Sequence, residues 1–178
     1  MPPVSKSFIV MRRLPDGTPI LIRRIRPGDR RLLAFGLRNL SALTVQQRFL
    51  GPKPRFTKQE LRYLTEGDGH DHVALVAESP TQPVRHLIAV ARFVRSPEDP
   101  EAAEVAIVVM DSWQGRGLGS LLARELAARA RGLGIKRFTA TMASDNLPAL
   151  RLMEKLAGHL EQGPSQHGVS ALVGDLAA

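Results

Sequence analysis

Apolar and polar residues alternate near the start of the chain in the way that predicts a β-hairpin. The segment Thr18–Arg24 carries isoleucine at alternate positions, which is typical of a strand with one buried face. The run before it, Phe8–Arg13, is separated from it by Leu14-Pro15-Asp16-Gly17, whose Asp-Gly pair favours a tight turn. We therefore expect an N-terminal hairpin over about residues 7–25.

Three helices are expected after this hairpin. Asp29 can cap the first, which runs to about Leu40 with its apolar positions mostly on one face. A shorter helix is expected at about Thr44–Leu50. The third begins with Thr57-Lys58-Gln59-Glu60, the pattern of a capping box, and runs to about Thr65.

Three strands come next, at His72–Ala77, Leu87–Val94 and Ala103–Met110. The third is an almost continuous apolar run, which is typical of a central strand covered on both faces. The connections between these strands are short, and short connections favour antiparallel neighbours. The sequence thus predicts an antiparallel meander.

The second half of the chain mixes helices and strands. We expect helices at Ser120–Arg131 and Asn146–Ala157, and strands at Phe138–Met142, Gly158–Glu161 and Val169–Leu176. No repeat or long linker divides the 178 residues, and this length is usual for one domain. The fold class expected is therefore α/β, in a single domain.

The charge of the chain favours anionic partners without identifying them. There are 25 lysines and arginines against 17 acidic residues, a formal net charge of +8. Proteins that bind nucleic acid usually cluster basic residues with aromatics between them, whereas here the arginines are spread along the chain. We expect a solvated basic surface and no nucleic-acid partner, with a nucleic-acid-binding module kept as the third alternative.

The chain contains no cysteine, which excludes disulfides, thiolate metal sites and a cysteine nucleophile. His70-Asp71-His72 offers two histidines but no third ligand at a suitable spacing, so no metal is expected. The first residues, Met1–Lys6, lack a signal pattern. No apolar run approaches the roughly 18–20 residues that a membrane span needs. We expect a cytoplasmic protein with no membrane partner.

The strongest chemical signal is Gln114-Gly115-Arg116-Gly117-Leu118-Gly119, placed between a strand and a helix. Glycines allow close approach of a ligand, and a loop that enters a helix directs free N–H groups at it, so the expected ligand is a phosphate or pyrophosphate. A P-loop would need Lys-Ser/Thr after its last glycine, and a dinucleotide fingerprint needs a sixth-position glycine where Ser120 stands. Arg116 could contact the phosphate or be solvated.

This loop resembles the acetyl-CoA pyrophosphate loop of the GNAT N-acetyltransferases, with their Gln/Arg-x-x-Gly-x-Gly/Ala spacing. The order of elements resembles this family over roughly Thr18–Gly158. More narrowly, Ile25–Asp29, Glu104–Val109 and Trp113–Gly117 resemble the acetyltransferase domain of bacterial Pat-type protein lysine acetylases. Those enzymes can carry a fused regulatory or synthetase-like module, and we expect none here.

The resemblance implies a mixed, mostly antiparallel central sheet flanked by helices, with a V-shaped splay that binds acetyl-CoA and a cofactor-binding core over about residues 103–158. The main chain of Val108 and Val109 would pair with the pantetheine arm. Amides from Gln114 through Ser120 would hold the pyrophosphate. Asn146 would contact the cofactor, with Ala149 on the same side; Asn146 could equally be a helix cap, or both.

Acetylation of an amine requires removal of a proton. A lysine with an ordinary pKa of about 10.4 is only about 0.04% free amine at pH 7, so a general base is needed. Glu104, at the head of the central strand, matches the glutamate given that role in Pat-type enzymes; a glutamate there could also be merely exposed. Many GNAT enzymes use a tyrosine as general acid, but Leu150–Lys155 has none and Tyr63 is distant in sequence. The absence of cysteine excludes a cysteinyl acyl-enzyme and favours direct attack within a ternary complex.

Several alternatives for function stay open. The resemblance favours a protein lysine as acceptor, with a small-molecule amine second. The rival from another class is a CoA-binding sensor without turnover, which the missing tyrosine favours. The acidic stretches Glu66–Asp71 and Glu98–Glu101 could attract a cationic acceptor or be solvated loops. A homodimer is also left open.

Overall fold

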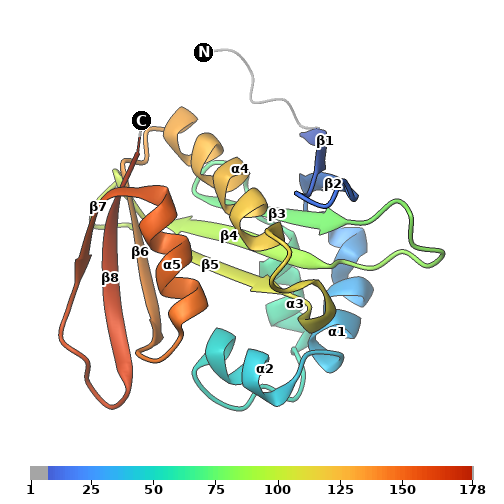
Figure 1. The fold of residues 1–178 in the computed structure, drawn as a ribbon, viewed down its shortest axis with the longest axis horizontal. Helices are drawn as coiled ribbons and strands as arrows, with labels where there is room; N and C mark the ends of the chain where they lie inside the picture. The colour runs from blue at the N-terminus through green and yellow to red at the C-terminus, as the bar shows by residue number, and fades with distance from the viewer. Residues whose placement is uncertain (1–7, 178) are drawn as a thin grey trace.

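The computed structural model describes residues 8–177, which contain one eight-stranded sheet with helices on both faces (Figure 1). Ser7, the expected first residue of the hairpin, lies outside the described residues, as do Met1–Lys6 and Ala178. The strands are β1 (Ile9–Arg13), β2 (Pro19–Arg24), β3 (His72–Glu78), β4 (Ala89–Arg95), β5 (Ala102–Val109), β6 (Arg137–Ala143), β7 (Ala157–Gln162) and β8 (Val169–Leu176).

Five α-helices flank the sheet within the described residues, in two layers. In Figure 1, α4 and α5 cover the near face of the sheet, and α1 and α3 lie on the far side. Each layer encloses its own apolar core, since alternate residues of a strand point to opposite faces. The helices are α1 (Arg30–Arg38), α2 (Ala42–Phe49), α3 (Lys58–Thr65), α4 (Leu118–Gly132) and α5 (Leu147–Leu156).

The sheet is mixed and mostly antiparallel, in the order β1-β2-β3-β4-β5-β6-β8-β7. The strands β1 to β5 form the expected antiparallel meander. The strands β5 and β6 are parallel, because α4 carries the chain back to the starting end of the sheet. The strand β8 then pairs in antiparallel fashion with β6 on one side and β7 on the other.

The two parallel strands separate after a short paired region. Ala102–Glu104 of β5 pairs with Arg137–Thr139 of β6, and the pairing ends there. The rest of β5 remains paired with β4, and the rest of β6 remains paired with β8. The sheet therefore opens into the expected V-shaped splay, which widens toward the C-terminal ends of β5 and β6.

Asp29 is the N-cap residue of α1, as expected, but its side chain does not cap the helix. A 3-10 turn, Pro27–Asp29, precedes α1, and the Asp29 side chain makes no cap hydrogen bond to that helix. Its carboxylate instead accepts two hydrogen bonds of 2.8 Å from the buried guanidinium of Arg23 and one of 2.8 Å from the Arg26 N–H. Arg23 is 2% exposed and also binds Glu78. The Asp29 carboxylate therefore belongs to a buried ion network and is not available to cap the helix.

No helix between residues 8 and 177 is both long and apolar enough to cross a membrane. Over the same part of the chain, no three His, Cys, Asp or Glu side chains gather as a metal site would require.

Candidate active site

The turn between β5 and α4 brings backbone N–H groups to the open end of the splay. Gly115 and Gly117 have φ values of 72° and 86°, a left-handed conformation that favours glycine. Gly117 is the N-cap of α4 and has no side chain to satisfy the first turn of this 15-residue helix. The N–H groups of that turn and the positive end of the helix dipole therefore stay available to an anion. A Cβ at Gly117 would lie 3.3 Å from Pro15 of the hairpin turn.

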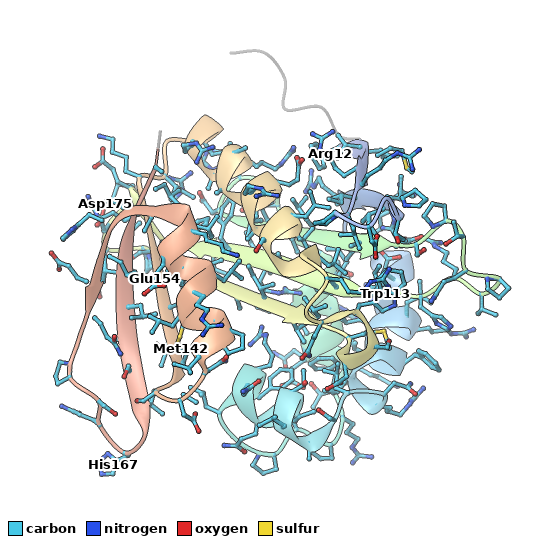
Figure 2. All side chains as sticks on the ribbon, viewed as in Figure 1. Arg12, Trp113, Met142, Glu154, His167 and Asp175 are labelled. Carbon is cyan, nitrogen blue, oxygen red and sulfur yellow. The ribbon has the colours of Figure 1, made fainter. Side chains whose placement is uncertain are left out.

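The Arg116 side chain fastens this loop to the N-terminal hairpin. Its Nη2 donates to Asp16 Oδ2 at 2.7 Å and to Thr18 Oγ1 at 3.0 Å. The guanidinium also lies 4.4 Å from the centre of the Trp113 ring, and Figure 2 shows Trp113 beside the turn that follows β5. Hydrogen bonds from Thr18 and Arg116 hold the pKa of Asp16 well below its usual range. In this structure Arg116 therefore positions the loop.

Alternation along β5 decides which main-chain groups face the splay. The Glu101 carbonyl accepts a hydrogen bond of 3.0 Å from Arg137 on the β6 side. The main-chain N–H and C=O groups of a strand point to alternate sides at successive residues. Val109, an even number of residues after Glu101, therefore points toward the β6 side, where the splay is open. Val108 points toward β4. The Val109 carbonyl accordingly accepts a hydrogen bond of 2.9 Å from the Gln114 side chain, outside the sheet ladder.

A polar network ties α2 to the same loop. Asp111, just after β5, accepts hydrogen bonds from the Ser41 N–H at 2.9 Å and from the Thr44 hydroxyl at 2.8 Å. Gln114 Nε2 donates to the same Thr44 oxygen at 3.1 Å. Burial would raise the pKa of Asp111, but the hydrogen bonds from Ser41 and Thr44 outweigh it and lower that pKa. The sequence reasoning missed this network, because its members are about 70 residues apart.

Glu104 lies where β5 and β6 separate. It is opposite Val94 on β4 and opposite Thr139 in the last pair with β6, and its side chain is exposed. Two arginines that the sequence reasoning did not select lie in its neighbourhood, Arg92 on β4 and Arg48 on α2. Burial lowers the pKa of Arg48, and the Glu104 carboxylate acts in the opposite direction.

On the other side of the splay, Asn146 caps α5. Its Oδ1 accepts a hydrogen bond of 3.2 Å from the Ala149 N–H, which confirms the cap that the sequence suggested. Ala149 is partly buried against the core below α4 and α5. Contact of these two residues with a cofactor stays a prediction.

The other residues singled out in the sequence are separated by the fold. His70 Nδ1 lies 2.6 Å from Asp71, whereas His72 Nε2 lies 3.1 Å from Arg92 Nη1, so the two histidines serve different partners. The Tyr63 ring, on α3, lies tilted against the His72 ring with ring centres 4.7 Å apart. Tyr63 is thus nearer the Glu104 face of the sheet than its place in the sequence indicated.

The acidic stretches carry charges that are largely balanced by basic neighbours. Asp71 pairs with Arg95 at 2.7 Å, and Asp99 pairs with Arg137 at 2.7 Å. Both stretches therefore take part in ion pairs at the end of the sheet where β5 begins. Attraction of a cationic acceptor by these stretches stays a prediction.

Comparison with known proteins agrees with this geometry. The acetyltransferase (GNAT) family matches residues 40–159, which include Glu104, the glycine loop and Asn146. The chain belongs to this family. Members of the GNAT family use acetyl-CoA as the acyl donor, and this membership places the chain among the acyltransferases.

Three relatives show where the similarity is concentrated. Acetyltransferase Pat of Mycolicibacterium smegmatis is 38% identical over 136 residues, which are 76% of this chain and 40% of Pat. The crystal structure of the GNAT domain of S. lividans PAT has a TM-score of 0.83 and 30% identity, over 94% of this chain and 97% of that domain. A putative phosphinothricin acetyltransferase of Bacillus subtilis, YwnH, is 35% identical over 80 residues, 45% of this chain and 49% of that protein. The chain thus spans less than half the length of Pat.

Proposed function

We propose that this protein transfers the acetyl group of acetyl-CoA to an amine in a ternary complex. The observation that carries the proposal is the position of the glycine loop. Free N–H groups at the start of α4 stand at the open end of a splay between β5 and β6. A pyrophosphate at the loop would direct the pantetheine arm into the splay, toward Glu104.

The cofactor is held mainly by the main chain in this proposal. Amides from Gln114 through Ser120 bind the pyrophosphate. The main chain of Val109 pairs with the pantetheine arm, and alternation makes Ile107 its companion in place of Val108, which faces β4. Asn146 and Ala149 border the cofactor from the α5 side.

The Glu104 carboxylate accepts the proton of the acceptor amine, directly or through water. The amine nitrogen attacks the thioester carbon, the new C–N bond forms, and the C–S bond breaks. Coenzyme A leaves as a thiolate and takes a proton from solvent. A thiol with a pKa of about 8.5 departs readily, so no tyrosine acid is required.

The acceptor that we propose first is a protein lysine, because the sequence resembles Pat-type enzymes most narrowly around Glu104 and the glycine loop. A small-molecule amine is the second candidate, and the similarity to a putative phosphinothricin acetyltransferase supports it. We further propose that the protein acts in the cytoplasm, where it needs neither a membrane nor nucleic acid.

Release of free CoA thiol with lysine peptides and small amines tests the proposal. We expect turnover by the wild-type protein, and a kcat/KM about 10²- to 10⁴-fold lower for Glu104→Gln with acetyl-CoA affinity unchanged. Glu154→Gln, an exposed carboxylate of α5, is the matched control. An undiminished rate in Glu104→Gln would remove Glu104 as the base. Tight CoA binding without turnover on any amine would favour the sensor.

A further inference from the structure

The sheet face opposite α4 presents its side chains in rows, because residues that are cross-strand partners share a face. The row nearest the start of β5 is His72, Val94 and Glu104. The next row has Arg92 between the alanines Ala74 and Ala106. The small side chains of Ala74 and Ala106 leave space around the long Arg92 side chain, in the row next to that of the proposed base Glu104.

Arg92 is a buried charge that pairs with no carboxylate among the described residues. It is 6% exposed, and its Nη1 donates to the Leu64 carbonyl at 3.3 Å and lies 3.1 Å from His72 Nε2. Within residues 8–177 no carboxylate forms an ion pair with it, and its Nε and Nη2 have no hydrogen-bond partner. Burial, and then the charge of Arg92, lower the pKa of His72. His72 is therefore a neutral neighbour of Arg92 at pH 7 and does not balance its charge.

A second cation lies nearby on α2. Arg48 is half-buried, stands 5.0 Å from the centre of the Phe49 ring, and makes no ion pair with any described residue. Burial and the charge of Arg48 together lower the pKa of Arg92 to about 10, so the Arg92 guanidinium is still charged at pH 7. Glu104 is the one carboxylate that acts on Arg48 in this region. Two cations therefore lie close enough to influence each other, and one of them, Arg48, also interacts with the exposed Glu104 carboxylate.

The surroundings suit a small organic ligand. Between α1, α2 and the sheet is a cavity of about 50 Å³ with apolar walls. Neither arginine lines it, but its walls include Phe49, which follows Arg48, and the Val90–Val108 pair in the row next to that of Arg92. The helix α2, which carries Arg48, is fastened at its N-terminus to Asp111. The cations are thus held on rigid elements with an apolar surface next to them.

We propose that Arg48 and Arg92 form a subsite for a carboxylate carried by the acceptor. The free Nε–Nη2 edge of Arg92 matches the two oxygens of a carboxylate, which arginine binds in bidentate fashion. Glu104 and Arg92 are diagonal cross-strand neighbours, and the backbone positions of such neighbours lie about 7–8 Å apart. That spacing lets one molecule place its amine at Glu104 and its carboxylate at Arg92. The subsite rests on the proposed acetyltransferase function, whose acceptor it specifies.

Matched acceptors that differ only in the carboxylate test the subsite. We would measure kcat/KM at saturating acetyl-CoA for amino acids against their amides, and for lysine peptides with glutamate against glutamine beside the lysine. In the wild type we expect the carboxylate member of a pair to be preferred by about 10- to 100-fold. A preference among free amino acids identifies the acceptor's own carboxylate as the source; a preference among peptides alone identifies an acidic neighbour of the lysine.

Three variants separate this role from a structural one. Arg48→Gln should abolish most of the preference by raising KM for the carboxylate acceptor alone, whereas Arg48→Lys should restore part of it. Arg92→Lys keeps the buried charge but not the bidentate edge, and should reduce the preference as well. Arg38→Gln removes an exposed arginine of α1 and should change nothing.

Equal kcat/KM for carboxylate and amide acceptors in an active wild type would overturn the subsite and leave the acetyltransferase function intact. If no acceptor is turned over, the subsite is tested by measuring ligand binding. Calorimetry in the presence of CoA should then detect N-acetylglycine and not N-acetylglycinamide. Equal or absent binding of the two would overturn the proposal.

Discussion

Asn146 is a residue at which structural and functional explanations can be separated by experiment. Its side chain caps α5 through the Ala149 N–H, and the same residue borders the side of the splay where the proposal places the cofactor. A cap acts on the folded protein whether or not a ligand is bound. A cofactor contact acts on affinity alone.

Asn146→Ala should lower the free energy of unfolding by about 1 kcal/mol, the usual loss for a helix cap. Asn146→Asp keeps a cap acceptor and adds a charge near the cofactor path. We expect Asn146→Asp to retain the stability of the wild type and to bind acetyl-CoA less tightly. Urea unfolding and calorimetry measure the two quantities. Full affinity in both variants would show that the residue is a cap only.

At the scale of elements, α2 is held in place by polar contacts more than by its short apolar face. Asp111 binds Ser41 and Thr44 at the N-terminus of the helix, where a negative charge is favourable. Gln114 links the same threonine to the cofactor loop. The helix that borders the acceptor face is thereby tied to the segment that we propose binds the cofactor.

Asp111→Asn should destabilise the protein by about 1–2 kcal/mol, because it removes the charge from these hydrogen bonds. The lowered pKa of Asp111 gives the sign of the pH dependence. The stabilisation is present above the ordinary aspartate pKa and is lost as pH falls through the lower folded-state value. Chemical unfolding at pH 7 measures the loss, with Glu98→Gln, an exposed carboxylate, as control. Equal stability of Asp111→Asn and the wild type at pH 7 would contradict this role.

The sequence predicted the elements well because their signals are local. The Asp16-Gly17 turn, the Thr57–Glu60 capping box and the apolar run of β5 each specify one element from neighbouring residues. The glycine loop was found for the same reason. Arg48 and Arg92 were missed, since only the strand register and the docking of α2 bring them near Glu104. The pairing of the Val108 main chain with the pantetheine arm was implied by the family resemblance alone, and only the strand register shows that this residue faces β4.

At the scale of the molecule, a buried ion network joins β2, β3 and the turn before α1. Arg23 on β2 binds Asp29 before α1 and Glu78 at the end of β3, and all three side chains are buried. Arg85 adds a second guanidinium to Glu78 at 2.8 Å. Burial raises the pKa of Asp29 and of Glu78, but the arginine contacts outweigh it, so both pKa values are below their ordinary ones.

Arg23→Gln should destabilise the fold at pH 7 by about 3–5 kcal/mol, because two buried carboxylates lose their counter-ion. In the wild type the network stabilises the fold above about pH 4, and this contribution is lost as pH falls further. The variant should lose less stability on acidification, since protonation relieves the repulsion. Urea unfolding at pH 7 and in mild acid measures both effects. Asp99→Asn, in a partly exposed pair, should show little change.

The affinity of acetyl-CoA for Gly119→Val tests the central proposal most directly. A Cβ at Gly119 would lie 3.6 Å from the Val109 side chain, an ordinary contact, and Gly119 has no positive φ, so the variant should fold. Its side chain would stand over the N–H groups that we propose hold the pyrophosphate. We predict by calorimetry a Kd raised at least about 10-fold, with Gly132→Ala at the other end of α4 unchanged. A wild-type Kd in a folded Gly119→Val protein would contradict the proposed cofactor site.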